Sequence, residues 1–117
     1  MILAIVDDLM TGVRIEEAAK AIGSRVEAVN AWEEAGARLR SGGVEGMVVD
    51  LAMDGLALDN LVGEARYAGA WLIGFYPHVN VELRRAAQRA GVDRVYPRSR
   101  FMRDLPNLLL ERLEKKT

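Results

Sequence analysis

The 117-residue sequence predicts one α/β domain built on a parallel five-stranded sheet with helices on both faces. Short apolar segments alternate along the chain with segments of helical periodicity, and this alternation occurs five times. Three of the segments are almost wholly apolar, which is typical of parallel strands buried on both faces. No linker or low-complexity stretch divides the chain, so residues 1–117 are expected to form a single domain.

The strands and the first helix follow from this alternation. The predicted strands are residues 2–6, 25–29, 46–49, 71–75 and 94–96. After the first strand, Ile15, Ala18 and Ile22 have the spacing of one buried helix face. Thr11 is the predicted N-cap of that helix, and Gly23 is the predicted residue just beyond its end.

Four more apolar stripes predict four more helices. They are Trp32, Ala35 and Leu39, ended by residues 41–43; Leu58, Leu61, Val62 and Ala65, ended near Gly69; Val79, Leu83, Ala86, Ala87 and Ala90, ended by Gly91; and Leu105, Leu108, Leu109 and Leu113. Pro106 is expected in the first turn of the last helix, where its missing N–H costs little. Lys115 and Lys116 are expected near the C-terminal end of that helix, which favours cations.

Composition excludes several classes of protein. The formal net charge is −1, so the totals do not indicate a nucleic-acid binder or a protein of acidic membranes. There are no cysteines, which excludes disulfides and thiolate metal sites and fits a reducing cytoplasm. No apolar run reaches the ~18 residues of a membrane span, and the opening MILAIVDD has no basic leader. We therefore expect a cytoplasmic protein.

Candidate functional residues follow the predicted strands. Ligands of open α/β sheets bind outside the carboxyl ends of the strands. The residues expected at that edge are Asp7 and Asp8 after the first strand, Asp50 after the third, Tyr76, Pro77 and His78 after the fourth, and Pro97 and Arg98 after the fifth. Three carboxylates, a guanidinium, an imidazole and a phenol are thus expected to lie together.

Clustered carboxylates suggest metal-assisted phosphoryl chemistry. They stay ionised only beside a cation, and Mg²⁺ prefers oxygen ligands. An aspartate beside such an ion can attack phosphorus, while the metal and Arg98 offset the developing charge. The alternative is that the acids cap helices or lie in solvent. The sequence contains no GxGxxG, P-loop or GxSxG motif and no zinc-ligand spacing.

Three segments resemble the receiver domain of response regulators. They are AIVDD at 4–8, MVVDLAMDG at 47–55 and AAQRAGVDRVYPRS at 86–99. The resemblance implies a flavodoxin-like three-layer sheet of order 2-1-3-4-5 with Asp50 as phosphoacceptor. It also implies Mg²⁺ held by Asp8, Asp50 and the backbone carbonyl of Ala52, with help from Asp7.

The chain departs from the receiver pattern in the part that reads the phosphoryl group. Receivers have Ser or Thr at the end of the fourth strand, where this chain has Tyr76. They have Lys-Pro after the fifth strand, where the order here is Pro97-Arg98-Ser99, and arginine is a planar fork rather than a point charge. Whether the Tyr96–Pro97 peptide is cis stays open. The chain therefore resembles atypical, pseudo-receiver-like members.

Other residues have two readings each. His78 can contact a phosphoryl group at the rim or bond to backbone and solvent. Trp32 and Trp71 are expected in the core, with Trp71 and Tyr67 at a partner surface as the alternative. Phe101 and Met102, in a predicted turn, fill the core or belong to a dimer face made by the fourth helix, fifth strand and fifth helix. Seven arginines form a solvated face or bind an acidic protein: Arg84, Arg85, Arg89, Arg94, Arg98, Arg100 and Arg103.

Three functions follow, and protein partners are expected for the first two. The first is a stand-alone signalling module that acts by protein–protein interaction without ordinary aspartate phosphorylation. The second is a single-domain response regulator phosphorylated on Asp50 with Mg²⁺. The third is a small phosphotransfer or hydrolase enzyme that uses the same acids.

Overall fold

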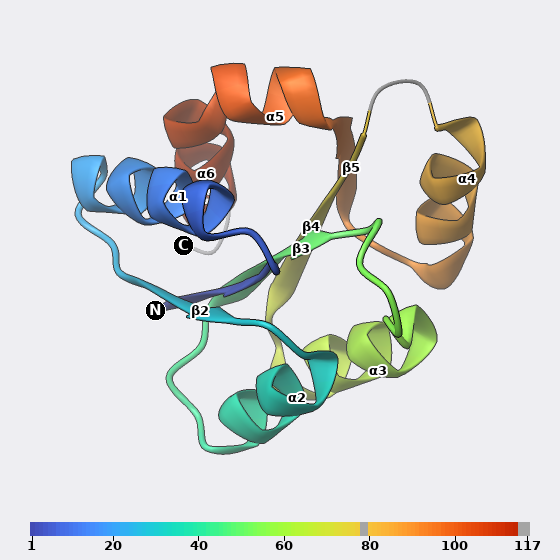
Figure 1. Cartoon of the computed structure of the whole chain (residues 1–117). Coiled ribbons are helices and arrows are strands. Elements are labelled where there is room, and N and C mark those ends of the chain that lie inside the picture. The colour runs from blue at the N-terminus through green and yellow to red at the C-terminus, as the bar shows by residue number, and fades with distance from the viewer. Residues whose placement is uncertain (78–79, 115–117) are drawn as a thin grey trace.

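Five parallel strands form one sheet, as predicted (Figure 1). The computed structural model describes residues 1–77 and 80–114, and the strands lie in the order β2-β1-β3-β4-β5. All four neighbouring pairs are parallel. The strands are β1 (Ile2–Ile5), β2 (Val26–Val29), β3 (Gly46–Asp50), β4 (Trp71–Tyr76) and β5 (Arg94–Pro97). The predicted flavodoxin-like order is confirmed, and each strand lies within one residue of its predicted bounds.

Helices cover both faces of the sheet, which gives three layers (Figure 1). They are α1 (Leu9–Ala21), α2 (Trp32–Arg40), α3 (Leu58–Ala68), α4 (Val81–Ala90), α5 (Arg98–Arg103) and α6 (Leu105–Glu114). One face packs against α1, α5 and α6, and the other against α2, α3 and α4.

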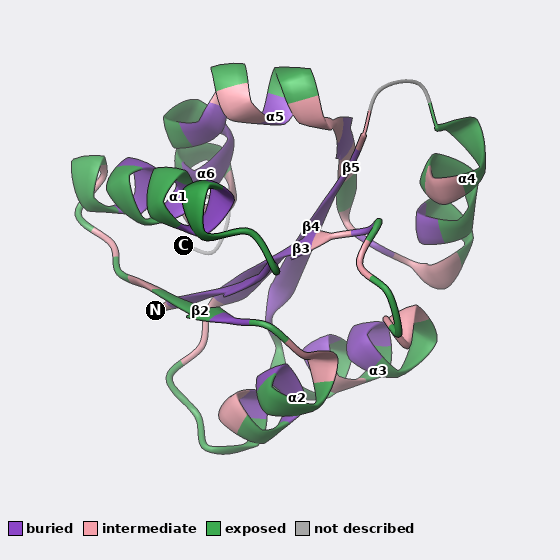
Figure 2. Cartoon of the chain, in the orientation of Figure 1, coloured by how far each residue is buried: buried purple, intermediate pink, exposed green. Residues whose placement is uncertain are grey.

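The sheet separates two apolar cores because successive side chains of a strand point to opposite faces. In β1, Ile2 joins the core under α1, and Leu3 joins the core under α2 and α3. Val48 and Val49 of β3 divide in the same way, and all four of these residues are fully buried. Figure 2 shows the central strands as buried along their length, which explains their continuous apolar sequences.

The first helix begins earlier than the sequence predicts. It starts at Leu9 and its N-cap is Asp8, so the prediction of Thr11 as N-cap is wrong. Asp8 has extended dihedrals, φ −114° and ψ 120°, and its carboxylate accepts a hydrogen bond from the backbone N–H of Thr11. Because Asp8 comes soon after the strand, its carboxylate caps the free N–H groups of the first turn, and the helix begins before Thr11. The predicted end is confirmed, since Gly23 follows the C-cap residue with φ +77°.

Residues 98–103 form the short helix α5, where the sequence predicts a turn. Phe101 of this helix is fully buried, and its ring stacks on Phe75 of β4 with centroids 4.8 Å apart and planes 7° apart. Met102 is partly buried against the same core. Burial of the phenylalanine ring favours a helix in a segment too short to be stable alone. Phe101 is therefore a core residue and does not form a dimer face.

Aromatic residues divide between core and surface. Trp71 is 5% exposed, which confirms its place in a buried strand, and Trp32 is partly buried. Tyr67 at the end of α3 is 92% exposed. Of the two residues considered for a partner surface, Tyr67 alone is accessible.

The prolines near the C-terminal end have ordinary backbone geometry. Every peptide bond of the described residues is trans, including Tyr96–Pro97. Pro106 lies in the first turn of α6, as predicted.

None of the helices described is long and apolar enough to cross a membrane. The expectations for His78, Val79, Lys115 and Lys116 lie outside the described residues.

Candidate functional site

The carboxyl ends of β1, β3 and β5 bring four of the predicted site residues to one edge of the sheet. Asp7 and Asp8 follow β1, Asp50 ends β3, and Arg98 begins α5 directly after β5. Their charges are close enough to interact, because Asp7, Asp8 and Arg98 all influence the pKa of Asp50. Their catalytic and metal-binding roles remain predictions.

Asp8 is held by contacts within the chain. Its Oδ2 accepts hydrogen bonds from the Thr11 backbone N–H at 3.2 Å and from the Thr11 hydroxyl at 2.5 Å. The Arg98 Nη2 lies 3.7 Å from the same oxygen and donates a hydrogen bond to the Thr11 hydroxyl oxygen. The Thr11 hydroxyl bond is the main cause that lowers the pKa of Asp8, and Arg98 adds to it. Asp8 is therefore a carboxylate whose charge is already stabilised.

Thr11 is a site residue that sequence reasoning placed in the wrong role. Its side chain is 1% exposed, and its hydroxyl links the Arg98 guanidinium to the Asp8 carboxylate. Buried hydroxyls need hydrogen-bond partners, and this one has both a donor and an acceptor. The spacing Asp8-x-x-Thr11 is the sequence signal that could have revealed this role, because the residue three positions after an N-cap donates its backbone N–H to the cap.

Asp50 has a different environment from Asp8. Its Oδ1 accepts a hydrogen bond of 2.9 Å from the backbone N–H of Ala52. Burial is the main cause that raises the pKa of Asp50, and the charges of Asp7 and Asp8 raise it further. The Ala52 bond and Arg98 act in the opposite direction but do not cancel the rise. Negative charge on Asp50 is thus less stabilised than negative charge on Asp8.

Arg98 is oriented by an aromatic pair. Its guanidinium carbon lies 5.5 Å from the centroid of the Phe75 ring, which itself stacks on Phe101. A flat guanidinium can lie over a ring while its N–H groups point elsewhere, and here they point to Thr11 and Asp8. The ammonium of a lysine at this position could not make the same set of contacts.

Tyr76 lies at the predicted strand end, but on the opposite face from Phe75. It is 6% exposed and packs in the core formed with α2, α3 and α4. The alternation of side chains along β4 separates it from the stacked pair of Phe75 and Phe101. The sequence predicted that Tyr76 lies at the end of the fourth strand, but it did not predict which face of the sheet the side chain packs against. His78 lies outside the described residues.

The acids of this edge do not fit a ready-made metal site. Within residues 1–77 and 80–114, no group of three or more acidic or histidine side chains is arranged to hold a metal ion. The oxygen donors suit Mg²⁺ chemically. However, Oδ2 of Asp8 is bonded to Thr11 and faces Arg98, a cation supplied by the chain itself.

Solved structures of response regulators share this fold. A response regulator from Thermotoga maritima gives a TM-score of 0.81 at 16% identity and covers 97% of this chain and 96% of its own. An orphan response regulator of H. pylori gives 0.80 at 17%, over 96% of this chain and 94% of that one. A LuxR family DNA-binding response regulator from Silicibacter pomeroyi gives 0.76 at 24%, over 97% and 91%. No protein-family model and no curated protein matches the sequence.

Proposed function

We propose that this protein, which has the fold of response-regulator receiver domains, is a signalling module that acts by binding a protein and is not switched by ordinary aspartate phosphorylation. One observation carries the proposal. Asp8, the acid that the resemblance assigns to Mg²⁺, is the N-cap of α1 and lies 3.7 Å from the Arg98 guanidinium. A metal ion would have to compete with this internal cation and with the Thr11 hydroxyl.

Tyr76 supports the same proposal. Where receivers have a small hydroxyl that reads the phosphoryl group, this chain has a phenol ring packed in the core. Movement of a buried ring requires a new cavity or a repacked core, because protein interiors are close-packed. A small shift of the kind that a serine or threonine makes is therefore unavailable here.

A second candidate is a response regulator that accepts a phosphoryl group on Asp50. The raised pKa of Asp50 favours this candidate. Burial and two neighbouring acids disfavour the negative charge of Asp50, and a bound divalent cation would stabilise that charge. Mg²⁺ needs only one or two carboxylates and keeps several waters. In this candidate, Asp50 and Asp8 bind the ion with the carbonyl of Ala52, and Asp7 assists.

Phosphate analogues distinguish the two candidates. We expect that Mg²⁺ with beryllofluoride leaves the melting temperature of the wild type unchanged, and that acetyl phosphate adds no phosphoryl group to Asp50 by mass spectrometry. Asp50→Asn is the control, because it keeps an oxygen for the Ala52 N–H and removes the acceptor. A response to either reagent that the Asp50→Asn variant loses would contradict the proposal and support the second candidate.

Arg98→Ala tests the internal cation directly. If Arg98 takes the place of a metal ion beside Asp8, the variant should acquire a stabilising response to ~10 mM Mg²⁺ that the wild type lacks. The response should disappear in the double variant Arg98→Ala/Asp8→Asn. An equal Mg²⁺ response of the wild type and of Arg98→Ala would show that Arg98 does not exclude the ion.

A further inference from the structure

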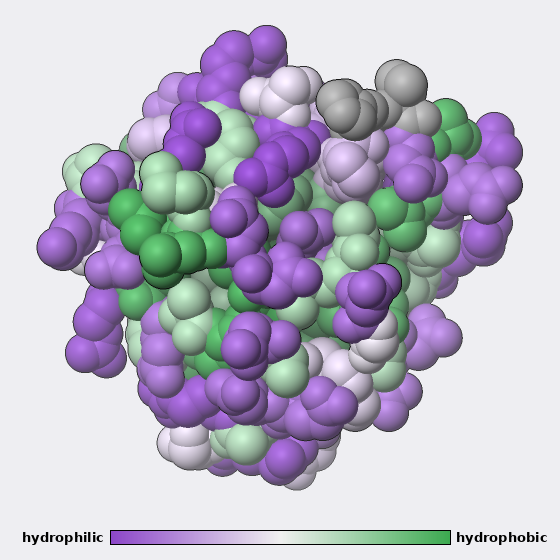
Figure 3. Space-filling view, in the orientation of Figure 1, coloured by the Kyte–Doolittle hydropathy of each residue, from purple (hydrophilic) through white to green (hydrophobic). Residues whose placement is uncertain are grey.

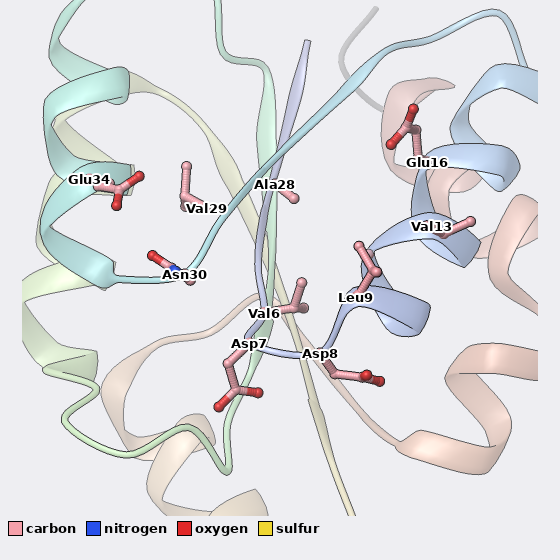
Figure 4. A pocket seen from close by; sticks show the side chains of 11 residues that line it. Val6, Asp7, Asp8, Leu9, Val13, Glu16, Ala28, Val29, Asn30 and Glu34 are labelled. Carbon is pink, nitrogen blue, oxygen red and sulfur yellow. The ribbon is translucent and has the colours of Figure 1, made fainter.

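A groove opens beside the acidic edge, between α1 and α2 (Figure 4). Its volume is about 460 Å³, within the range of ligand-binding pockets. Val6, Val13 and Ala28 belong to its apolar lining. Glu16 of α1 and Glu34 of α2 stand on its two walls (Figure 4). The lining of the groove therefore combines apolar side chains with carboxylates.

The α1 wall of the groove exposes large apolar side chains. Leu9 is 80% exposed and Val13 37%, and both line the groove. Met10, which is 66% exposed, is a neighbouring residue of α1 outside the lining. Figure 3 shows apolar side chains gathered over α1 with hydrophilic ones around them. Contiguous exposed apolar surface with a polar rim is typical of a protein-binding site. Nothing in the described part of the chain covers it.

Three acidic residues that line the groove have no cationic partner in the described part of the chain, unlike Asp8, which faces Arg98. Asp7, Glu16 and Glu34 are exposed, and none of them forms an ion pair within the described residues. A partner for this groove must therefore bring positive charge together with apolar surface.

The net charge of −1 conceals a strong separation of charge along the chain. Residues 1–63 contain 11 acidic and 5 basic residues, whereas residues 64–117 contain 6 acidic and 11 basic residues. The first part forms β1, β2 and β3, and the second forms β4 and β5. Since β2 and β5 are the two edge strands, the molecule is negative toward one edge of the sheet and positive toward the other.

Helix α4 presents the complement of the groove. Arg84, Arg85 and Arg89 are exposed and form no ion pair in the part of the chain that the structure describes. Val81 is 39% exposed and lies on the same helix face as Arg85 and Arg89, at spacings of four and eight residues. This face offers one apolar side chain, guanidinium groups, and apolar arginine stems that can lie along the groove.

We propose that the groove between α1 and α2 binds helix α4 of a second copy of this chain. The contact joins an acidic edge to a basic edge, so it is heterologous and leaves one groove and one α4 free in each pair. Association then continues head to tail and lengthens with concentration. This inference goes beyond the proposed signalling role, and either can fail without the other.

Sedimentation velocity at increasing protein concentration tests the association. At ~50 mM salt, the weight-average sedimentation coefficient should rise with concentration, and at ~0.5 M salt the rise should be lost because exposed charges are screened. A monomer up to ~1 mM protein at low salt would overturn the proposal.

Two charge-reversed variants test the geometry of the contact. Glu16→Lys/Glu34→Lys alters only the groove, and Arg85→Glu/Arg89→Glu alters only α4. Each variant should be monomeric alone. An equimolar mixture should assemble head to tail again, with the two variants alternating. The basic α4 of the first variant meets the acidic groove of the second, and the acidic α4 of the second meets the basic groove of the first. A mixture that stays monomeric, or a single variant that still assembles, would exclude this contact.

A matched control separates position from net charge. Glu17→Lys/Asp59→Lys makes the same charge change at exposed positions that do not line the groove. It should assemble as the wild type does, and circular dichroism should show that all variants are folded. Loss of assembly in this control would attribute the association to net charge and overturn the proposed site.

Discussion

A single glycine shows how closely this sheet is packed. Gly46 begins β3 and pairs in register with Trp71, which begins β4. A Cβ atom at Gly46 would lie 2.0 Å from the indole Cε2 of Trp71. The requirement for glycine is therefore one of space, because the large indole of a buried tryptophan lies across the strand. Sequence inspection gives no sign of this contact, since the two residues are 25 positions apart.

Replacing Gly46 by alanine should destabilise the protein by about 1–3 kcal/mol, the usual cost of overpacking. Urea unfolding followed by far-UV circular dichroism measures it. Gly63→Ala is the matched control, because Gly63 lies in α3 and a Cβ atom added there would meet nothing within 4 Å. That change should stabilise by roughly 0.5–1 kcal/mol. Trp71→Phe should relieve part of the Gly46→Ala cost, and no coupling between the two would contradict the packing explanation.

For the site residues as well, the sequence indicates their position but not their contacts. Asp7, Asp8, Asp50 and Arg98 could be placed at one edge from the sequence, because the carboxyl ends of parallel strands meet there. Their partners could not be inferred. The hydrogen bond from Arg98 to Thr11, which links Arg98 to Asp8, joins residues 87 positions apart.

At the scale of elements, the strands were predictable, and so were the starts of α2, α3 and α6 at Trp32, Leu58 and Leu105. The start of α1 and the helix α5 were not predictable. Strand bounds follow from apolar runs, which burial on both faces requires. Both Asp8 and Thr11 could cap the free N–H groups at the start of α1. Asp8 comes earlier in the chain and is the residue that caps them, so the helix begins at Leu9. The helix α5 has no apolar periodicity, and the burial of Phe101 against Phe75 explains its place.

Asp8 substitutions separate the capping role of this residue from its charge. Asp8→Ala removes the cap and should lower the melting temperature by roughly 3–6 °C. Asp8→Asn should lower it less, because asparagine is a good N-cap and an exposed ion pair contributes little. Equal losses for the two variants would indicate that the pairing with Arg98 outweighs the cap.

The pH dependence of this effect has a defined sign. The Thr11 hydroxyl bond lowers the pKa of Asp8 in the folded protein below its ordinary value of 3.8. The charge of Asp8 therefore stabilises the fold above pH 3.8, and the contribution is lost as the pH falls through the lowered value. The difference in melting temperature between wild type and Asp8→Asn should shrink on acidification below pH 3.8.

At the scale of the whole molecule, the two cores share one sheet. The radius of gyration is 12.7 Å, close to the value of about 13 Å expected for a compact domain of this length. Ile2 and Leu3 are neighbours in β1 but belong to different cores. Loss of either helix layer would expose one face of the same central strands. The two cores should therefore unfold together.

Thermal unfolding should be a single transition. Near-UV signals from the buried Trp71 and far-UV signals from all helices should give the same midpoint, and the calorimetric enthalpy should equal the van't Hoff enthalpy. As a local probe, hydrogen exchange should be slowest in β1, β3 and β4, whose residues are buried on both faces. Two midpoints would mean that the cores unfold separately.

The sequence by itself determined the strand and helix order, the parallel sheet and the edge at which the acidic residues lie. It could do so because apolar periodicity records burial, and burial of a sheet on both faces allows few topologies. Only the tertiary structure decided that Asp8 is paired with Arg98 through Thr11 and that Tyr76 is a core residue. Those features depend on distances between side chains far apart in the chain, and local patterns carry no record of such distances.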